Sequence, residues 1–490
     1  MNGKFAKAAA LSALLTSPAL AAQDSITLGM VLEPPNLDPT GGAAAAIDEI
    51  VYANIFEGLT RIGRDGSVRP GLAKSWDAEN GGKSYLFHLR EGVSFHDGNA
   101  FDAQDVIFSL DRARAAESTN AQKTLFEGIE KAEAVDPLTV RVTLKAPDGG
   151  FPFKMAWGDA VIVDEASVKD IATSPVGTGP FRFQDWAQGD HVSLVANDQY
   201  WGEKPAIKAA TFRFIPDPSA AFAAMMSGDV DAFPIYPAPE TLAQLQADPR
   251  FKVLVGTTEG ETILAMNHAR PPLELLKVRE AIAHALNRQE IIDGAMFGYG
   301  TPIGTHFAPH NPDYVDLTAE SAYDPERSKA LLAEAGVKDL TLRLALPPPP
   351  YARRGGEIVA AELRAVGINT QIINMEWAQW LEQVFKNADY DLTIISHVEP
   401  MDIGIYARPG YYFNYGNPAF DKVMGLLDEA TEPGERSRLL RQAQEILAGT
   451  YANGFLFQLA KTGVANAQIE GLWENAPMPA NDLSEVRWTE

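Results

Sequence analysis

Two adjacent arginines, Arg353 and Arg354, are the residues of this sequence best suited to hold an anionic ligand. They lie at the predicted start of a helix that ends before Gly367. A guanidinium group forms two parallel hydrogen bonds to a carboxylate, and the pair is strong where solvent is excluded. Cationic side chains oppose the dipole at a helix N-terminus, which favours a binding role. The alternative is a solvated helix start that pairs with Glu357 or Glu362.

The segment from Ser396 to Tyr415 combines acidic with aromatic side chains directly after a predicted strand. Ligands of open α/β sheets bind beyond the carboxyl ends of strands, so this segment is the second candidate. Glu399 and Asp402 provide carboxylates. Aromatic rings stack on planar ligands or surround cations, although partial burial at an interface is the alternative. The aromatic residues of the segment include His397, Tyr406, Tyr411, Tyr412 and Tyr415.

Motifs of catalysis are missing from the sequence. It has no GxSxG elbow, no HExxH and no His or Cys cluster with metal-ligand spacing. Gly82-Lys83-Ser84 lacks the leading glycine of a phosphate-binding loop, because Asp77 occupies that position. We therefore expect a protein that is not an enzyme and that has no resident metal or cofactor.

The elements that position these residues alternate between strands and helices. Leu340 to Leu346 predicts a strand that ends in four prolines, and Ile368 to Asn374 and Leu392 to Ser396 predict two more. Helices are predicted between them, the second over Trp377 to Lys386. Such alternation is typical of a parallel or mixed sheet, so we expect an α/β fold.

Length and charge narrow the class of protein further. A chain of 490 residues exceeds one hydrophobic core, so two or three domains are expected. The net charge of −24 argues against a nucleic-acid surface, which needs clustered Lys and Arg to neutralise phosphates.

The N-terminus predicts export. Lys4 and Lys7 precede a short apolar run and the small-residue site Ala19-Leu20-Ala21, so residues 1–21 are predicted to be a signal peptide. The sequence has no cysteine that could carry a lipid anchor, and no later apolar stretch approaches the roughly 20 residues of a membrane span. We expect a monomer that is free in the periplasm of a Gram-negative cell.

The segment from Pro70 to Arg114 predicts a strand, a turn and a helix. Tyr85 and Phe87 alternate with polar residues, Val93 to Phe95 predicts a second short strand, and Asp102 is suited to cap a helix. This unit resembles the signature of the peptide/nickel/opine class of periplasmic solute-binding proteins of ABC importers, family 5. The matching residues are Gly71-Leu72-Ala73, Ser75-Trp76, Phe87-x-Leu89-Arg90, Val93, Phe95-His96-Asp97-Gly98 and Asp102-x-x-Asp105-Val106.

The resemblance implies roles for several residues. In the family, the loop that matches Glu33 lines the ligand cleft, and an arginine in the context of Arg353-Arg354 holds the carboxylate of a dipeptide. Family dipeptide binders carry an acidic, glycine-rich run where this chain has its aromatic segment, which argues against a simple dipeptide and leaves an opine or another amino-acid conjugate open. Trp377 aligns with a tryptophan near the cleft, and Asn267 lies at the predicted exit of a hinge strand.

The resemblance also implies a type II-like periplasmic binding protein fold, with two lobes joined by two hinge strands near Ile263–Asn267 and Gly454–Leu459. The expected parts are residues 22–50, 170–262 and 456–490 for the main part of lobe I, 51–169 for a subdomain inserted in lobe I, and 263–455 for lobe II. A ligand that bridges the lobes would stabilise the closed state, which then docks on a membrane permease.

The expected ligand is a small peptide, an opine or another amino-acid conjugate that is zwitterionic or anionic. Two alternatives remain open at this point. One is a carrier of a metal or metal chelate, because the family includes nickel binders. The other is an exported hydrolase that would use Glu399 or His397.

Overall fold

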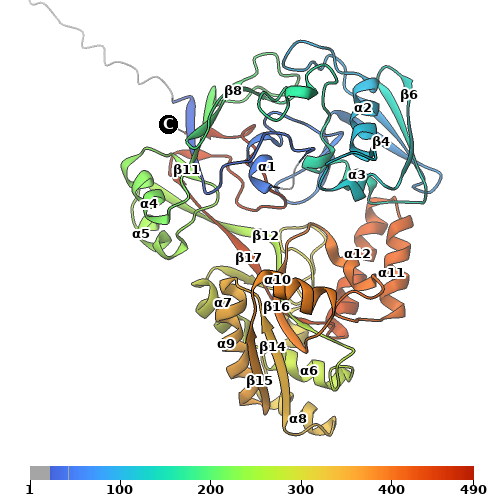
Figure 1. Ribbon diagram of the computed structural model, residues 1–490, viewed down its shortest axis with the longest axis vertical. Helices are drawn as coiled ribbons and strands as arrows, with labels where there is room; N and C mark the ends of the chain where they lie inside the picture. The colour runs from blue at the N-terminus through green and yellow to red at the C-terminus, as the bar shows by residue number, and fades with distance from the viewer. Residues whose placement is uncertain (1–22, 42–43, 490) are drawn as a thin grey trace, which may run out of the picture.

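A computed structural model describes residues 23–41 and 44–489 of the chain (Figure 1). The predicted signal peptide, residues 1–21, lies outside this range. The chain forms two lobes, one above the other in Figure 1, and a long sheet passes through both. No helix of the described residues has the length and apolar character to cross a membrane.

The main sheet connects the lobes. Its strands lie in the order β15 (Ile368–Asn374), β14 (Leu340–Leu346), β16 (Leu392–His397), β12 (Phe251–Met266), β17 (Gly454–Asn466), β11 (Ala232–Phe233), β1 (Ser25–Met30), β10 (Ala209–Phe214), β9 (His191–Ala196) and β8 (Phe181–Ala187), and β13 (Gly300–Pro302) pairs with β17. Strands β15 to β16 belong to lobe II, and β11 to β8 belong to lobe I. The two-lobed α/β fold with two connecting strands is therefore confirmed.

The connecting strands β12 and β17 are antiparallel partners over most of their length. Phe251 to Thr257 pair with the lobe I half of β17, and the register shifts between Thr257 and Glu261. The residues after this shift, Glu261 to Met266, pair with β16 of lobe II. The hinge strand predicted at Ile263 is thus the end of a strand that already begins at Phe251. Polar residues and glycines ahead of Ile263, such as Gly256 and Gly260, concealed it.

Lobe I has its core around α1 (Ala45–Val51) and the C-terminal segment. The Asn54 side chain joins them, because its amide donates to the Asn481 carbonyl at 2.8 Å and its oxygen accepts from the Leu483 amide at 3.0 Å. Lobe I also contains β18 (Ile469–Glu470), β19 (Arg487–Trp488), α4 (Pro218–Ser227) and α5 (Leu242–Gln246). The tail after the second hinge strand packs on lobe I.

The inserted subdomain is a four-stranded antiparallel sheet covered by a helix. The strands lie in the order β4 (Ala73–Glu79), β5 (Ser84–Leu89), β7 (Thr139–Leu144) and β6 (Ile129–Asp136), with α2 (Ala103–Arg114) packed against them. Asp102 caps α2 by accepting from the Gln104 amide at 2.7 Å, as its sequence context predicted. The prediction of a short strand from Val93 to Phe95 was wrong, because in this stretch only Ser94 forms a β-bridge, with Ala100.

Smaller elements link the subdomain to the rest of lobe I. They are β2 (Thr60–Ile62), β3 (Val68–Pro70) and α3 (Phe151–Lys154). The bounds drawn from the sequence for the lobes and the subdomain stay predictions.

Lobe II covers both faces of its sheet with helices. Leu344 and Ile394 point to one face, against α6 (Leu276–His284), α7 (Arg288–Met296), α8 (Pro325–Glu334) and α9 (Pro350–Ala365). Ala345 and Ile395 point to the other face, against α10 (Trp377–Trp380), α11 (Pro418–Glu429) and α12 (Pro433–Gly449). Strands β14, β15 and β16 are parallel, so their carboxyl ends meet at one edge.

The lobes also meet at the rim opposite the hinge, where α11 and α12 approach the inserted subdomain (Figure 1). The Gly149 amide of the subdomain donates to the Asp428 carbonyl of α11 at 2.6 Å. A Cβ atom on Gly149 would lie 1.8 Å from the carbonyl oxygen of Ala430, so this approach requires glycine.

Candidate ligand site between the lobes

The carboxyl edge of the lobe II sheet carries most of the candidate residues predicted from the sequence. Arg353 follows β14 and lies in the first turn of α9, and Trp377 follows β15. His397 ends β16, and Asp402 begins the short helix that comes next. Three loops that are far apart in sequence are thus neighbours in space because their strands are parallel.

Arg353 is held at this edge by an acidic neighbour. Its Nη2 atom donates to Glu376 Oε1 at 3.0 Å and to the Met375 carbonyl at 3.2 Å. The side chain of Glu376 is 80% exposed, so this ion pair is open to solvent. The Nε atom of Arg353 is buried and has no hydrogen-bond partner, which leaves one donor free for another acceptor.

Arg354 and Trp377 point to other neighbours. The Arg354 guanidinium lies over the ring of Phe297, 5.3 Å from its centre. Trp377 is exposed and packs edge to face on Trp380. The two arginines therefore differ in surroundings, and only Arg353 lies beside an acidic group of a neighbouring loop.

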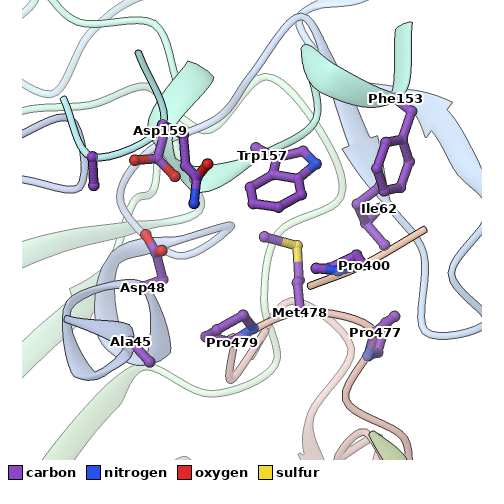
Figure 2. A pocket seen from close by; sticks show the side chains of 13 residues that line it. Ala45, Asp48, Ile62, Phe153, Trp157, Asp159, Pro400, Pro477, Met478 and Pro479 are labelled. Atoms are coloured by element: carbon purple, nitrogen blue, oxygen red, sulfur yellow. The ribbon is translucent and has the colours of Figure 1, made fainter. Parts of the chain in front are cut away.

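A cavity of about 140 Å³ lies between lobe I and the loop after β16 (Figure 2). Its wall is mainly apolar, and Pro400 is the residue contributed by lobe II. The lobe I wall combines α1, the inserted subdomain and the C-terminal segment. It consists of Ala45, Asp48, Ile62, Ala121, Gln122, Phe153, Trp157, Gly158, Asp159, Pro477, Met478 and Pro479.

Two carboxylates, Asp48 and Asp159, give this cavity an acidic end. Burial raises the pKa of Asp48 well above its ordinary value, and the charge of Asp159 raises it further. Burial also raises the pKa of Asp159, to about 6. The Oδ1 atom of Asp48 is buried without a hydrogen-bond partner. Gly158 permits this placement, because a Cβ atom there would lie 2.3 Å from Asp48 Oδ1. A cationic ligand group would compensate both carboxylates.

The aromatic segment after β16 forms part of the lobe II core. Tyr406 and Tyr412 are buried, Tyr411 and Tyr415 are half-buried, and Glu399 is exposed. The Tyr415 hydroxyl bonds to Thr450 Oγ1 at 2.9 Å. Tyr406 and Tyr412 are therefore packed in the core of lobe II. Burial was the alternative to a ligand contact that the sequence left open for these tyrosines.

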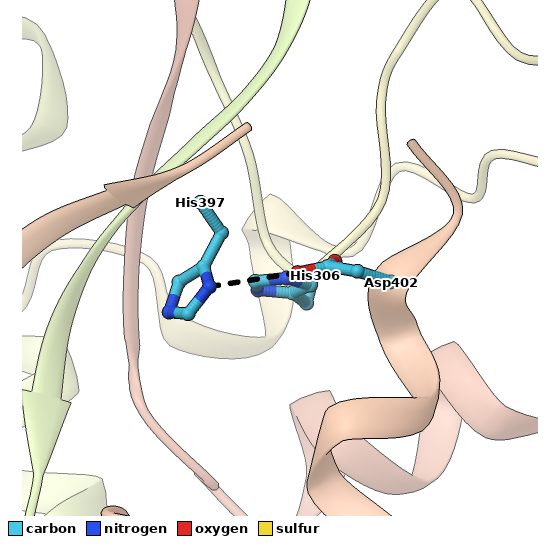
Figure 3. A group of neighbouring side chains, drawn as sticks. All are labelled: His306, His397 and Asp402. Carbon is cyan, nitrogen blue, oxygen red and sulfur yellow. Dashed lines mark hydrogen bonds and ion pairs between the residues drawn. The ribbon is translucent and has the colours of Figure 1, made fainter. Parts of the chain in front are cut away.

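A buried cluster of His306, Asp402 and His397 lies beside the segment (Figure 3). His306 Nε2 is 2.7 Å from Asp402 Oδ1, and His397 Nδ1 is 3.5 Å from Asp402 Oδ2. Burial alone would raise the pKa of the Asp402 carboxyl, but the two imidazoles hold it well below its ordinary value. His306 was missed by sequence reasoning, because it lies 96 residues before Asp402 and no metal-ligand spacing connects them.

Glu33 and Asn267 both make contacts within the protein. Glu33 Oε1 accepts from Trp186 Nε1 at 3.0 Å and from the Gly189 amide at 2.9 Å. Asn267 is buried and donates to the carbonyls of Ala388 and Tyr390. The structure brings neither residue into the wall of the described interlobe cavity.

The cavity residues Asp48, Trp157, Asp159 and Met478 were also missed. They come from segments that lie far apart in the chain, and none belongs to a recognisable motif. The prolines that flank Met478 were the one available signal, since Pro477 and Pro479 fix an extended segment.

Two lobes, two connecting strands and a cavity where Pro400 of lobe II faces a wall of lobe I residues define a binding protein for a small solute. The chain belongs to the bacterial extracellular solute-binding proteins of family 5, the substrate-binding proteins of ABC transporters. The model of the middle part of this family matches residues 67–403.

Curated relatives cover most of the chain. The chain is 31% identical to the dipeptide-binding protein of Escherichia coli (strain K12) over 381 residues, which are 71% of this chain and 70% of that protein. It is also 31% identical to the glutathione-binding protein GsiB of Pectobacterium atrosepticum over 466 residues, 89% of this chain and 88% of that protein.

Solved structures share the fold. HbpA2 from Haemophilus parasuis has a TM-score of 0.86 at 22% identity and covers 95% of this chain and 100% of its own. The unliganded open form of MppA, a periplasmic murein tripeptide binding protein, has a TM-score of 0.86 at 21% identity, with coverage of 96% and 98%. The protein AgaA in complex with agropinic acid, from A. tumefaciens R10, has a TM-score of 0.71 at 24% identity, with coverage of 95% and 99%.

Proposed function

We propose that this chain captures a small peptide-like or opine-like solute that carries both a positive amine and a carboxylate. The solute enters between the lobes, and its amine lies at Asp48 and Asp159 in the cavity wall of lobe I. The observation that carries the proposal is the unpartnered, buried Asp48 Oδ1 atom in a cavity of lobe I that Pro400 of lobe II faces. A buried carboxylate without a partner is costly, and an ammonium group would relieve that cost.

The apolar walls of the cavity select for a solute with nonpolar parts. Trp157, Phe153, Ile62 and Met478 surround the space beyond the two carboxylates (Figure 2). A ligand with a charged end and an apolar body buries the body against these side chains, which supplies the hydrophobic part of the affinity. Peptides and amino-acid conjugates have this combination, and the names of the relatives include peptide binders and a glutathione binder.

Arg353 is the proposed partner of the solute carboxylate. Its Nε donor is free, and its contact with exposed Glu376 is weak in water and easily exchanged. A carboxylate in that place gains two parallel hydrogen bonds from the guanidinium group when the lobes close and exclude water. Of the remaining candidates of the segment, Glu399 is exposed and Tyr411 is half-buried, and both would contact the distal part of the solute.

Release to an ABC permease in the inner membrane completes the proposed role, with the exported chain acting as a periplasmic monomer. Closure over the solute creates the surface that the permease recognises, because only the closed state is stabilised by contacts to both lobes. We propose binding without chemical turnover, so a bound peptide should be recovered intact.

The test combines native mass spectrometry with calorimetry. A small solute that copurifies with the chain is identified by its mass, and its affinity is then measured beside that of a peptide series. Acetylation of the peptide amine should abolish binding to the Asp48 and Asp159 site, and amidation of the carboxylate should weaken the contact to Arg353. Equal affinity for the free and the acetylated peptide would refute the amine site.

A further inference from the structure

We propose that His306, Asp402 and His397, together with Glu261, form a binding site in lobe II for one divalent transition-metal ion, with Zn²⁺ as the best fit. The site lies beside the solute cavity and does not depend on the proposed solute. Two imidazoles with one or two carboxylates are a donor set that suits Zn²⁺ and its neighbours in the first transition row.

The geometry of the donor atoms carries the proposal. One ligand atom from each of His306, His397 and Asp402 lies within 4.8 Å of the other two. Asp402 accepts from His306 Nε2 through one oxygen and faces His397 Nδ1 with the other, so both imidazoles turn a nitrogen to the same carboxylate (Figure 3). An ion in this space would replace the protons that these contacts now share.

The nitrogen on the far side of each imidazole already has a partner. The Tyr406 hydroxyl is 3.3 Å from His306 Nδ1, and the Tyr412 hydroxyl is 3.0 Å from His397 Nε2. Tyr406 is itself fixed, because its hydroxyl accepts from Asn453 Nδ2 at 2.9 Å. Metal-binding histidines commonly hydrogen-bond through the distant nitrogen, which sets the tautomer and the ring orientation. Both rings thus present their near nitrogens to the ion.

Glu261 is the proposed fourth donor; its carboxylate lies outside the group of atoms within 4.8 Å of one another, so its side chain would turn toward the ion on binding. Glu261 stands directly opposite His397 in the register of β12 and β16 and lines one small pocket with His306 and Asp402. Its side chain is 3% exposed, and its Oε2 atom has no hydrogen-bond partner. An unpaired carboxylate oxygen in the interior is costly, and a cation removes that cost.

Zn²⁺ binding to the metal-stripped full-length chain tests the proposal. Equilibrium dialysis with elemental analysis should give one Zn²⁺ per chain, and Co²⁺ should give the intense visible absorption of a four-coordinate ion. Tyr406→Phe, which keeps the packing of the ring, should weaken Zn²⁺ binding roughly 10-fold to 100-fold. His306→Ala and Asp402→Asn should weaken it at least as much.

A matched control uses the exposed pair of His191 and Asp190, whose Nδ1 and Oδ2 atoms are 2.8 Å apart. His191→Ala should leave Zn²⁺ binding unchanged. Circular dichroism identifies any variant that fails to fold, and Glu261→Gln then serves in its place, with an expected loss of at least about 10-fold. Absence of stoichiometric Zn²⁺ from the wild-type chain, or an equal loss in His191→Ala, would show that the cluster is a hydrogen-bond network only.

Discussion

Arg353 and Glu376 form a 3.0 Å ion pair between the loops that follow β14 and β15. Each residue belongs to a different crossover of the lobe II sheet, and the pair spans the edge at which ligands of α/β sheets bind. In the proposed site, a solute carboxylate would replace Glu376, whose side chain is 80% exposed.

Replacement of Arg353 should test this exchange. We expect Arg353→Ala to weaken the binding of a solute with a free carboxylate at least about tenfold, or about 1.4 kcal/mol, by calorimetry. Arg354→Ala is the matched control, because that guanidinium lies over Phe297 and should affect affinity less than twofold. An equal loss in the two variants would mean that general charge, and not the Arg353 contact, attracts the solute.

The acidic end of the cavity predicts a pH dependence. Because the pKa of Asp159 is raised to about 6, this carboxyl gains a proton as the pH falls from 7.5 to 5. A cationic solute binds the ionised form, so its affinity should fall about tenfold over this range. Asp159→Asn should bind weakly at both pH values and remove most of the dependence. A wild-type affinity that rises toward pH 5 would contradict the amine site.

The contact between the lobes at the rim should be broken by one methyl group added at Gly149. Gly149→Ala places a Cβ atom against the Ala430 carbonyl, so the lobes should separate at the rim. We expect the lobe arrangement that makes this contact to lose roughly 1–3 kcal/mol, seen as a larger radius in small-angle scattering and weaker solute binding. Gly150→Ala is the control, since a Cβ atom there meets no atom closer than 3.3 Å. A radius unchanged from wild type would show that the rim contact does not limit closure.

The raised pKa of Glu362 on α9 should make the free energy of unfolding depend on pH. Burial raises its pKa to about 8, more than the Asn287 amide lowers it. The native state then holds a proton that the unfolded state releases near pH 4.5. Its contribution to stability is full below that value and is lost as the pH rises through about 8.

Glu362→Gln removes this titration. Urea unfolding should show a smaller loss of stability between pH 5 and 8.5 in the variant than in wild type. The variant should gain roughly 1–3 kcal/mol at the upper end. Parallel curves for the two proteins would mean that Glu362 ionises normally.

The sequence could predict which candidate residues gather at the edge of the lobe II sheet, because their positions depend on local order. Strands and helices alternate from Leu340 to His397, and parallel pairing places the residue after each strand at one edge, as for Arg353 and Asp402. The lobe I half of the site did not follow from the sequence, because Asp48, Asp159 and Met478 meet only through tertiary packing. Tyr412 shows a further limit of prediction from sequence. Its amphipathic ring is equally suited to a ligand contact and to a hydrophobic core, and in the structure it packs on Tyr390 and Trp380 in the core.

The place of β17 in the sheet has a consequence for biosynthesis. This strand pairs with β11 and β12 inside lobe I, yet it comes after the whole of lobe II in the chain. The lobe II elements from α6 to α12 follow one another without interruption between β12 and β17, and β17 also pairs with β13 of lobe II. Lobe I lacks an interior strand of its sheet until nearly all of the chain has been made.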